Sequence, residues 1–326
     1  MRAIPKNNAM RIAFALLPAL CVLLSACGMK HRTSLLPSSG GRPYEVLLVG
    51  DTDRIVLAEL QADAEALPQP EPSFDVSDIP SSLYNQSVWL ARAIVIVRCD
   101  ATRYTETRLR YEKNLHAHPQ MVVYVNTPSV KALRQEMPAW GGQLRELLTR
   151  FEMNAEMEQL ARGGNPRQEK TVKEVVGCTI RVPADMVRAK RARRFVWLAT
   201  DSPTGMQNLC VYTLPMHPLS LQWIAAQRDS VMRANLPGER PGMYVQTVGE
   251  TLSARTGSEK GGYRTIVRGL WEMKDDAMGG PFVAHIVADT AHSRYVVAEA
   301  FVYAPEMRKR NKMRQTEAVL YTLKVK

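Results

Sequence analysis

Two histidines in the N-terminal half of the chain have a spacing that could support metal binding. His116 and His118 are separated by one residue, so in an extended segment both imidazoles would lie on one face and could reach the same metal ion. The sequence around them offers no evident third ligand, and a surface turn ahead of Pro119 explains the same residues. We therefore predict that the chain has no metal site. His116 and His118 are the candidate ligands if a metal does bind.

Two aspartates form a second candidate site. Asp51 and Asp53 follow an apolar segment over 44–50 that is typical of a buried strand, and helical spacing begins soon after them. Ligands often bind where a strand of an open sheet ends and a helix begins. Two carboxylates at such a point could hold a cation or act as acid and base. Capping of the following helix requires the same residue types, and we favour capping.

A turn between two strand-like segments is the best candidate for a loop that binds a ligand or a partner. Its residues are Asp275, Asp276, Met278, Gly279, Gly280 and Pro281. Glycines permit positive φ or a close backbone approach, and loops carried between strands often bind ligands or partners. Trp271 and Tyr303 could line this turn or fill the core. The alternative is a hairpin turn of unusual geometry.

The start of the sequence predicts a lipid anchor at Cys27. A basic stretch precedes an apolar run over 12–24, which is shorter than the roughly 20 residues that span a membrane and fits a secretory signal. Leucine, two small residues and cysteine over 24–27 form the lipobox of bacterial lipoproteins. We expect cleavage before Cys27, a diacylglyceryl group on its thiol and acylation of the new amine, with no other cofactor. The alternative is a cleaved signal with an incidental cysteine, or an uncleaved helix.

Residues 28–32 carry no acid, whereas acids beside the cysteine resemble signals for inner-membrane retention or surface export. We therefore expect an outer membrane lipoprotein that faces the periplasm. The net charge of +11 does not imply nucleic acid in that compartment. Anionic lipid attracts basic side chains at about 1 kcal/mol each near the surface. For the basic runs 188–194 and 308–314 we favour solvated faces, with orientation on the membrane as the alternative.

Three cysteines, Cys99, Cys178 and Cys210, remain beside Cys27 once the cysteine inside the signal is set aside. The periplasm permits disulfides, but an odd number leaves at least one thiol free. Each of the three lies in strand-like sequence, where a small buried apolar residue is the usual role. The sequence leaves open whether Cys178 and Cys210 form a disulfide.

The composition, 45% hydrophobic and 23% charged, is that of a globular protein. Hairpin-like pairs of strands outnumber helical crossovers, which favours an α+β fold of two lobes with mostly antiparallel sheets and packed helices. Glycine, asparagine and proline over 163–166 mark the boundary between the lobes. The predicted organisation is a signal peptide over 1–26, a lipidated tether over 27–41, an N-terminal lobe over 42–166 and a C-terminal lobe over 167–326.

Residue patterns place elements within each lobe. Strands are predicted over 44–50, 93–97, 105–112, 121–125, 177–182, 195–199, 209–213, 243–248, 262–272, 282–288, 295–302 and 318–324. Helices are predicted from 53 to about 67, from 128 to 162 with a break over 138–142, and over 183–190, 219–234 and 305–317. The proline-rich passage 68–80 excludes regular helix and central strand, so we expect a surface loop packed against its own domain.

Several stretches resemble an uncharacterised family of Bacteroidetes envelope lipoproteins that carries a domain-of-unknown-function label. They are residues 268–274, 278–283, 299–306 and 313–321, together with 36–50, 67–72 and 74–77. The resemblance spans essentially the whole chain after Cys27. It implies a location in the cell envelope, and it supplies no activity, substrate or catalytic residue.

The sequence assigns no catalytic residue. It contains no Gly-x-Ser-x-Gly, no P-loop, no glycine-rich dinucleotide motif, no His-Glu-x-x-His and no Cys-x-x-Cys. We therefore expect a binding or envelope-assembly role, with membrane lipid as one partner through Cys27 and an envelope protein as another. The alternative is an envelope hydrolase or metal-dependent enzyme that uses the aspartates or histidines named above.

Overall fold

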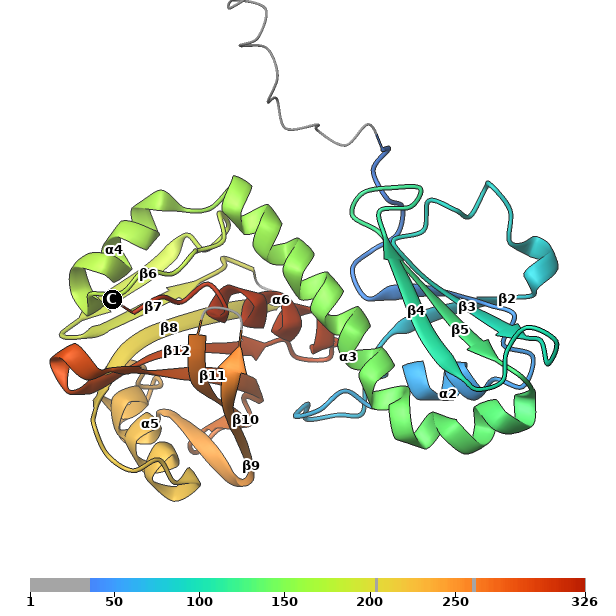
Figure 1. The fold of residues 1–326 in the computed structure, drawn as a ribbon. Coiled ribbons are helices and arrows are strands. Elements are labelled where there is room, and N and C mark those ends of the chain that lie inside the picture. The colour runs from blue at the N-terminus through green and yellow to red at the C-terminus, as the bar shows by residue number, and fades with distance from the viewer. Residues whose placement is uncertain (1–35, 203–204, 260–261, 326) are drawn as a thin grey trace, which may run out of the picture.

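The computed structural model describes residues 36–202, 205–259 and 262–325. The signal peptide and Cys27, and with them the predicted acylation, lie outside the described residues. The described chain forms two lobes, each with its own sheet, and the long helix α3 (Val130–Arg162) joins them (Figure 1). No helix in the described ranges is long and apolar enough to cross a membrane.

The N-terminal lobe is a five-stranded mixed sheet in the order β2-β1-β3-β5-β4. The strands β1, β2, β3 and β5 pair in parallel, and β4 runs antiparallel to β5. Helix α2 (Ile55–Leu60) and the first half of α3 cover one face, where Leu48, Val95 and Val123 are buried. The strand bounds are Glu45–Val49, Asp75–Ile79, Ala93–Cys99, Arg108–Lys113 and Met121–Thr127 for β1 to β5, and a short 3-10 helix spans Ser81–Leu83.

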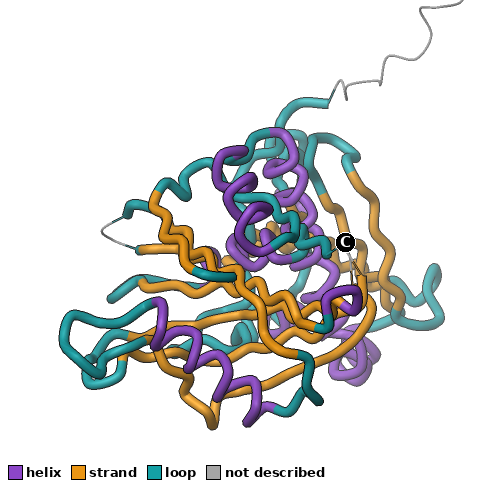
Figure 2. The backbone as a smooth tube through the Cα atoms, turned by 90° about the vertical axis from the view of Figure 1, so that its left-hand side faces the viewer, coloured by secondary structure: helices purple, strands orange, loops and turns teal. Residues whose placement is uncertain are grey.

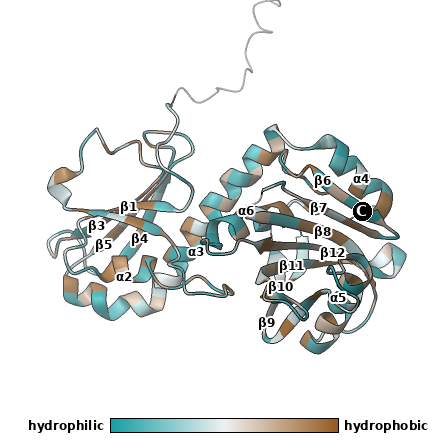
Figure 3. Ribbon diagram, turned by 180° about the vertical axis from the view of Figure 1, so that it is seen from behind, coloured by the Kyte–Doolittle hydropathy of each residue, from teal (hydrophilic) through white to brown (hydrophobic). Residues whose placement is uncertain are grey.

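The C-terminal lobe is a seven-stranded antiparallel sheet in the order β6-β7-β8-β12-β11-β10-β9. Figure 2 shows helices on both sides of this sheet, and Figure 3 shows hydrophobic residues along its strands. Helices α4 (Pro166–Val176) and α6 (Arg310–Leu320) pack on one face and α5 (Leu221–Asn235) on the other. The strand bounds are Arg188–Ala192, Phe195–Ala199, Met206–Pro215, Val245–Glu259, Gly262–Met273, Gly279–Asp289 and Arg294–Tyr303 for β6 to β12, and a 3-10 turn spans Thr290–His292.

The predicted α+β fold with two lobes and packed helices is confirmed. The expected antiparallel pairing holds throughout the C-terminal sheet, whereas among the described strands of the N-terminal sheet only β4 and β5 pair antiparallel. Several local predictions are wrong. Helix α3 continues through Pro138, because its buried residues, among them Met137, Leu144 and Leu148, pack against the N-terminal sheet and stabilise the helix across the proline. The predicted helix to residue 67 ends at Leu60, the segment 183–190 forms a turn and the start of β6, and the segment 318–324 holds the end of α6 and a turn instead of a strand. The predicted strand over 177–182 forms only an isolated bridge between Thr179 and Lys324. Residues 75–79, expected in a surface loop, form the edge strand β2, because they pair in parallel with β1.

The proline-rich passage connects the two lobes, so the expectation that it packs on its own domain is also wrong. The carboxylate of Glu71 accepts hydrogen bonds from the backbone N–H groups of Lys309 (2.7 Å) and Arg310 (3.0 Å) at the start of α6. The first N–H groups of a helix have no partner within the helix, so a carboxylate placed there caps it. Arg310 also pairs with Asp75 at 2.7 Å. Glu71 is only 5% exposed, so these contacts are shielded from water.

Candidate functional site

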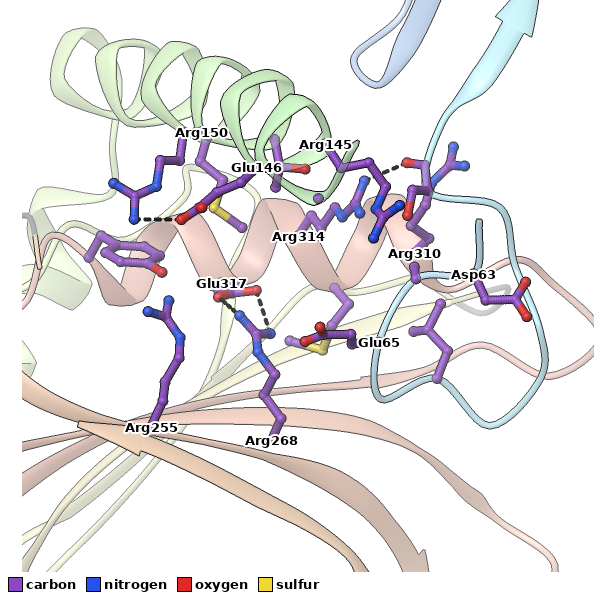
Figure 4. Close-up of a pocket in the computed structure, with 18 residues that line it drawn as sticks. Asp63, Glu65, Arg145, Glu146, Arg150, Arg255, Arg268, Arg310, Arg314 and Glu317 are labelled. Atoms are coloured by element: carbon purple, nitrogen blue, oxygen red, sulfur yellow. Dashed lines mark hydrogen bonds and ion pairs between the residues drawn. The ribbon is translucent and has the colours of Figure 1, made fainter. Parts of the chain in front are cut away.

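A cavity of about 440 Å³ lies between the lobes (Figure 4). The proline-rich loop, α3, the strands β9 and β10, and α6 form its walls. Its charged lining residues are the arginines Arg145, Arg150, Arg255, Arg268, Arg310 and Arg314 and the acids Asp63, Glu65, Glu146 and Glu317. The site therefore combines side chains that are far apart in the sequence.

Helix α6 presents one charged face to this cavity. Arg310, Arg314, Glu317 and Tyr321 recur every three or four residues, so their side chains lie along one side of the helix. Met313 lines the cavity beside them, and the opposite side carries Val319, which packs in the core of the C-terminal lobe. The amphipathic pattern of α6 thus fixes its orientation and aims the charged side chains between the lobes.

A buried ion pair crosses the floor of the cavity from the sheet to α6. Arg268 of β10 donates two hydrogen bonds to the carboxylate of Glu317, at 2.9 and 2.5 Å, and Glu317 is 1% exposed. Burial alone would lower the pKa of Arg268, but the paired carboxylate outweighs it and the pKa is raised above its ordinary value. This guanidinium therefore stays charged.

Two further arginines are neutralised from outside the cavity. Arg145 pairs with Glu59 of α2, and Arg310 pairs with Asp75 of β2. Neither of those carboxylates lines the cavity. The arginine side chains are therefore held in place by their partners while they still present positive charge to the interior.

Arg314 has no ion pair with a described carboxylate. Its guanidinium donates to the backbone carbonyl of Ser73 at 2.7 Å and lies over the rings of Tyr44 and Phe74, at 4.8 and 5.4 Å from their centroids. Burial, together with the nearby charges of Arg310 and Arg268, lowers the pKa of Arg314 to about 10. It is still a cation at neutral pH, and the nearby carboxylate of Glu317 is already paired with Arg268.

The lining offers charge and hydrogen-bond donors but no evident acid–base pair. Among the described residues, no histidine or cysteine lines the cavity. Burial raises the pKa of Tyr321 to about 12, so its hydroxyl is protonated at neutral pH and can donate a hydrogen bond. Guanidinium groups match carboxylate and phosphate oxygens in geometry, so the arrangement is suited to binding an oxyanion.

The two aspartates predicted from the sequence lie away from this cavity. Asp51, 4% exposed, accepts hydrogen bonds from the backbone N–H groups of Ile55 (3.1 Å) and Leu57 (2.8 Å) at the start of α2. Burial raises the pKa of Asp51. Asp53 is exposed and pairs with Arg134 at 3.2 Å. Asp51 therefore acts as a helix cap, and neither carboxylate lines the interlobe cavity.

The two histidines also occupy structural positions. His116 stacks on Trp89 with ring centroids 4.7 Å apart. The backbone of His118 pairs with the tether, since its carbonyl accepts from Ser39 (3.2 Å) and its N–H donates to Pro37 (2.9 Å). Within the described ranges, no group of three or more His, Cys, Asp or Glu side chains could hold a metal ion.

The turn over 275–281 forms a hairpin between β10 and β11. Asp275 has a φ of 63°, and Asp276 accepts the N–H of Met278 at 3.1 Å. A Cβ on Gly280 would lie 2.1 Å from the carbonyl oxygen of Val302, so this glycine serves a close backbone approach. Gly279, Gly280 and Pro281 pair within the sheet, Trp271 is buried, and none of these residues lines the interlobe cavity.

The three cysteines of the described chain are free thiols. Cys178 and Cys210 are buried, as their apolar surroundings indicated, whereas Cys99 is exposed. The Cys178–Cys210 disulfide left open from the sequence is not formed. Burial raises the pKa of Cys178 to about 12, so this thiol stays protonated.

The sequence did not identify the arginines of the cavity. The basic run 308–314 was visible, but a solvated face was expected, whereas Arg310 is buried against the other lobe. The available signal was the repeat of Arg310, Arg314 and Glu317 opposite apolar residues on one helix. That pattern alone could not show which other segment of the chain packs against the charged face of α6. The second basic run, 188–194, forms the exposed edge strand β6 and its turn.

The fold and the cavity define a two-lobed α+β protein with an arginine-rich site between its lobes. Residues 165–322 match the family model of a domain of unknown function (DUF4837), and residues 39–161 match that of another (DUF8532). Each lobe thus matches a domain of unknown function, which confirms that part of the resemblance seen in the sequence. No curated protein matches the chain.

The similar solved structures show only a distant likeness. The Ran-binding protein Mog1p of Saccharomyces cerevisiae has 14% sequence identity and a TM-score of 0.26, over 44% of this chain and 83% of that protein. A mutant of protein Mog1 has 12% identity and a TM-score of 0.28, over 45% and 90% of the two chains. We base no functional argument on this likeness.

Proposed function

We propose that this chain is a lipid-anchored binding protein of the bacterial cell envelope, and that it binds a compact oxyanion in the cavity between its lobes. The observation that carries the proposal is Arg314, a largely enclosed guanidinium without a carboxylate partner among the described residues. A bound phosphate or carboxylate group would supply the missing counter-charge.

The balance of enclosed charge supports an anion. Asp63, Glu65 and Glu146, three of the four acids that line the cavity, are exposed at its rim, where water screens them. The charged lining groups that are buried or half-buried are four arginines (Arg145, Arg268, Arg310 and Arg314) and the carboxylate of Glu317. Since Glu59, Glu317 and Asp75 pair with Arg145, Arg268 and Arg310, one positive charge is left over, that of Arg314. A cavity of about 440 Å³ lies within the range of small-molecule sites, roughly 300–1,000 Å³.

The anchor and the location are supported by the sequence. The lipobox at Cys27 and the acid-free residues after it favour an outer membrane lipoprotein that faces the periplasm. The family resemblance adds a Bacteroidetes-type bacterium as the source. The tether is bound to the N-terminal lobe, since Gly40 donates its N–H to Leu90 at 2.8 Å and accepts from Arg92 at 3.0 Å. The test is membrane association and palmitate labelling of the wild-type chain and of Cys27→Ala. A Cys27→Ala chain that still incorporates palmitate and stays in the membrane would contradict the anchor.

Anion binding can be measured by titration calorimetry on the unlipidated mature chain. Pyrophosphate, inorganic phosphate and citrate are the probes, and spermidine is the cationic control. We expect at least one of the anions to bind with saturation at one site. Arg314→Met should weaken that binding roughly 10- to 100-fold, because a hydrogen bond to a charged group contributes about 1.5–3 kcal/mol. Arg162→Met removes an exposed arginine and is the matched control.

Two results would refute the cavity as an anion site. One is the absence of binding by all three anions at millimolar concentration. The other is an anion affinity that Arg314→Met and Arg162→Met change equally. The enzyme alternative predicts turnover of phosphate esters that depends on Asp53 or the two histidines. Since Asp51 is engaged as a cap, we favour binding without catalysis.

A further inference from the structure

A second basic hollow, of about 540 Å³, lies on the N-terminal lobe beside the edge strand β4. Its lining includes arginines from β3, β4 and the loop between them, together with three tyrosines. Arginine and tyrosine are the residue types enriched in protein–protein interfaces. The hollow shares no lining residue with the interlobe cavity, so it is a separate feature of the surface.

Strand register places the polar side chains of this hollow in two rows. Asn126 of β5 is aligned with Arg98 of β3 on one side and Arg108 of β4 on the other. Two residues away, Tyr124 is aligned with Arg110 of β4. Side chains two residues apart on a strand lie on the same face, so these residues share the face that α2 and α3 leave open.

The loop over 79–91 covers only part of that face. Ile79, Tyr84 and Ala91 pack there against apolar residues of β1, β3 and β5 such as Val49 and Ile96. The arginines of β4 lie beyond this cover, and Arg108 and Arg110 are both exposed. The sheet therefore has an open, positively charged face at its β4 edge.

The charges of this face are only partly compensated. Arg108 pairs with Glu106. Arg98 lies over the ring of Tyr124, at 4.5 Å from its centroid, and neither Arg98 nor Arg110 makes an ion pair with any described carboxylate. Asn126 is only 7% exposed, and its Oδ1 atom has no hydrogen-bond partner in the described part of the chain.

The backbone of β4 offers a second means of recognition. Among the strands that the structure describes, β4 pairs with β5 alone, so the N–H and C=O groups along its other side are open to another strand. The strand contains no proline, and its side chains are mostly exposed. Tyr111, which is 53% exposed, adds an aromatic surface on the opposite face of the same edge.

We propose that β4 binds an extended acidic segment of a partner envelope protein by strand addition. The segment would bond to the free backbone groups of β4, and its alternate side chains would place carboxylates against Arg98 and Arg110. Backbone pairing of this kind provides affinity, while alternate side chains provide specificity. The partner is thus recognised by two features together, an extended backbone and negative charge on one face. This site is independent of the anion cavity.

Three labelled peptides separate these two features by fluorescence anisotropy with the unlipidated mature chain. The first alternates glutamate and threonine over eight residues, the second replaces glutamate by lysine, and the third replaces threonine by proline, which removes backbone N–H donors. We expect the Glu–Thr peptide to bind at least tenfold more tightly than either other peptide. Hydrogen exchange over 108–113 should slow when it binds.

Charge reversal at the two unpaired arginines provides the residue-level test. Arg98→Glu combined with Arg110→Glu should weaken binding of the Glu–Thr peptide at least tenfold, with an unchanged Tm as evidence of folding. Arg193→Glu, at an exposed arginine of the other lobe, is the matched control, and Arg314→Met should have no effect. Equal binding of the proline peptide would overturn strand addition. Equal binding of the lysine peptide, or no binding of the Glu–Thr peptide at millimolar concentration, would overturn recognition of an acidic segment.

Discussion

Replacement of Glu71 by alanine should loosen the contact between the two lobes. The Glu71 carboxylate accepts two backbone hydrogen bonds from the start of α6, at 2.7 and 3.0 Å, and it is 5% exposed. Without it, two N–H groups stay buried without a partner. Loss of a helix cap costs about 0.5–2 kcal/mol, and an unsatisfied buried donor about 1–3 kcal/mol. Since these contributions overlap, we expect a loss of roughly 2–4 kcal/mol.

Hydrogen exchange measures this loss where it occurs. If the first turn of α6 opens locally, a cost of roughly 2–4 kcal/mol corresponds to exchange about 30- to 1,000-fold faster over residues 309–313. Faster exchange is also expected over the loop 68–75, which loses its contact with the helix. Glu65→Ala is the control, because Glu65 lies on the same loop, is exposed, and makes no ion pair with a described residue.

Two outcomes would refute this account of the lobe contact. The first is exchange in α6 that is less than about fivefold faster in Glu71→Ala, which corresponds to about 1 kcal/mol. The second is an equal effect of Glu65→Ala, which would show that loss of loop charge, not loss of the cap, governs the opening of α6. Glu71→Gln should fall between alanine and the wild type, because it keeps one oxygen acceptor and loses the charge.

Three further predictions concern stability. Glu299→Leu should lower the free energy of unfolding, measured with urea, by about 3–5 kcal/mol, because it leaves Arg228 buried without the carboxylate of Glu299. The double variant with Arg228→Met should recover most of that loss. If the two single effects simply add in the double variant, the pairing is contradicted. Gly280→Ala should lower stability by about 1–3 kcal/mol or more, because a Cβ would lie 2.1 Å from a backbone oxygen, whereas Gly249→Ala, with nothing within 4 Å, should have little effect on Tm. Burial opposes the shift, but hydrogen bonds from neighbouring histidine and arginine side chains lower the pKa of Asp289. Ionised Asp289 therefore stabilises the fold above the unfolded pKa of about 3.9. This stabilisation is lost as the pH falls through the folded pKa. Asp289→Asn should therefore lose less stability than the wild type between pH 6 and pH 3, and equal losses would contradict the assignment.

Much of the strand pattern could be predicted from the sequence, because buried strands appear as short apolar runs. The runs at 93–97 and 121–125 are the central strands β3 and β5, and those at 195–199 and 209–213 lie in β7 and β8. The prediction failed where contacts between residues far apart in the sequence determine the local structure. Pro138 suggested a break, yet Gly141 lets α3 pass so close to Glu59 of α2 that a Cβ there would overlap that side chain. No local pattern reports such a contact.

The candidate site was hidden from the sequence for the same reason. Its arginines come from α3, β9, β10 and α6, and each arginine alone is typical of a solvated surface. What distinguishes Arg314 is the absence of a carboxylate partner and the carbonyl of Ser73 that it reaches across the lobes. Both facts depend on how the proline-rich loop docks on α6. The aspartates and histidines, which did stand out by type and spacing, have structural roles instead: Asp51 caps a helix and the backbone of His118 holds the tether.

The contact between the lobes and the anion cavity share one helix. Arg310 of α6 pairs with Asp75 across the lobe contact, while its neighbour Arg314, one turn further along, lines the enclosed space and makes no ion pair with a described carboxylate. An anion held by arginines from both lobes would therefore add a bond between them, and would favour the arrangement in which Glu71 caps α6. Linkage is reciprocal: whatever strengthens the lobe contact must also raise the affinity of the cavity for its anion. The cap at Glu71 and the charge at Arg314 thus act on the same equilibrium, although only one of them lines the site.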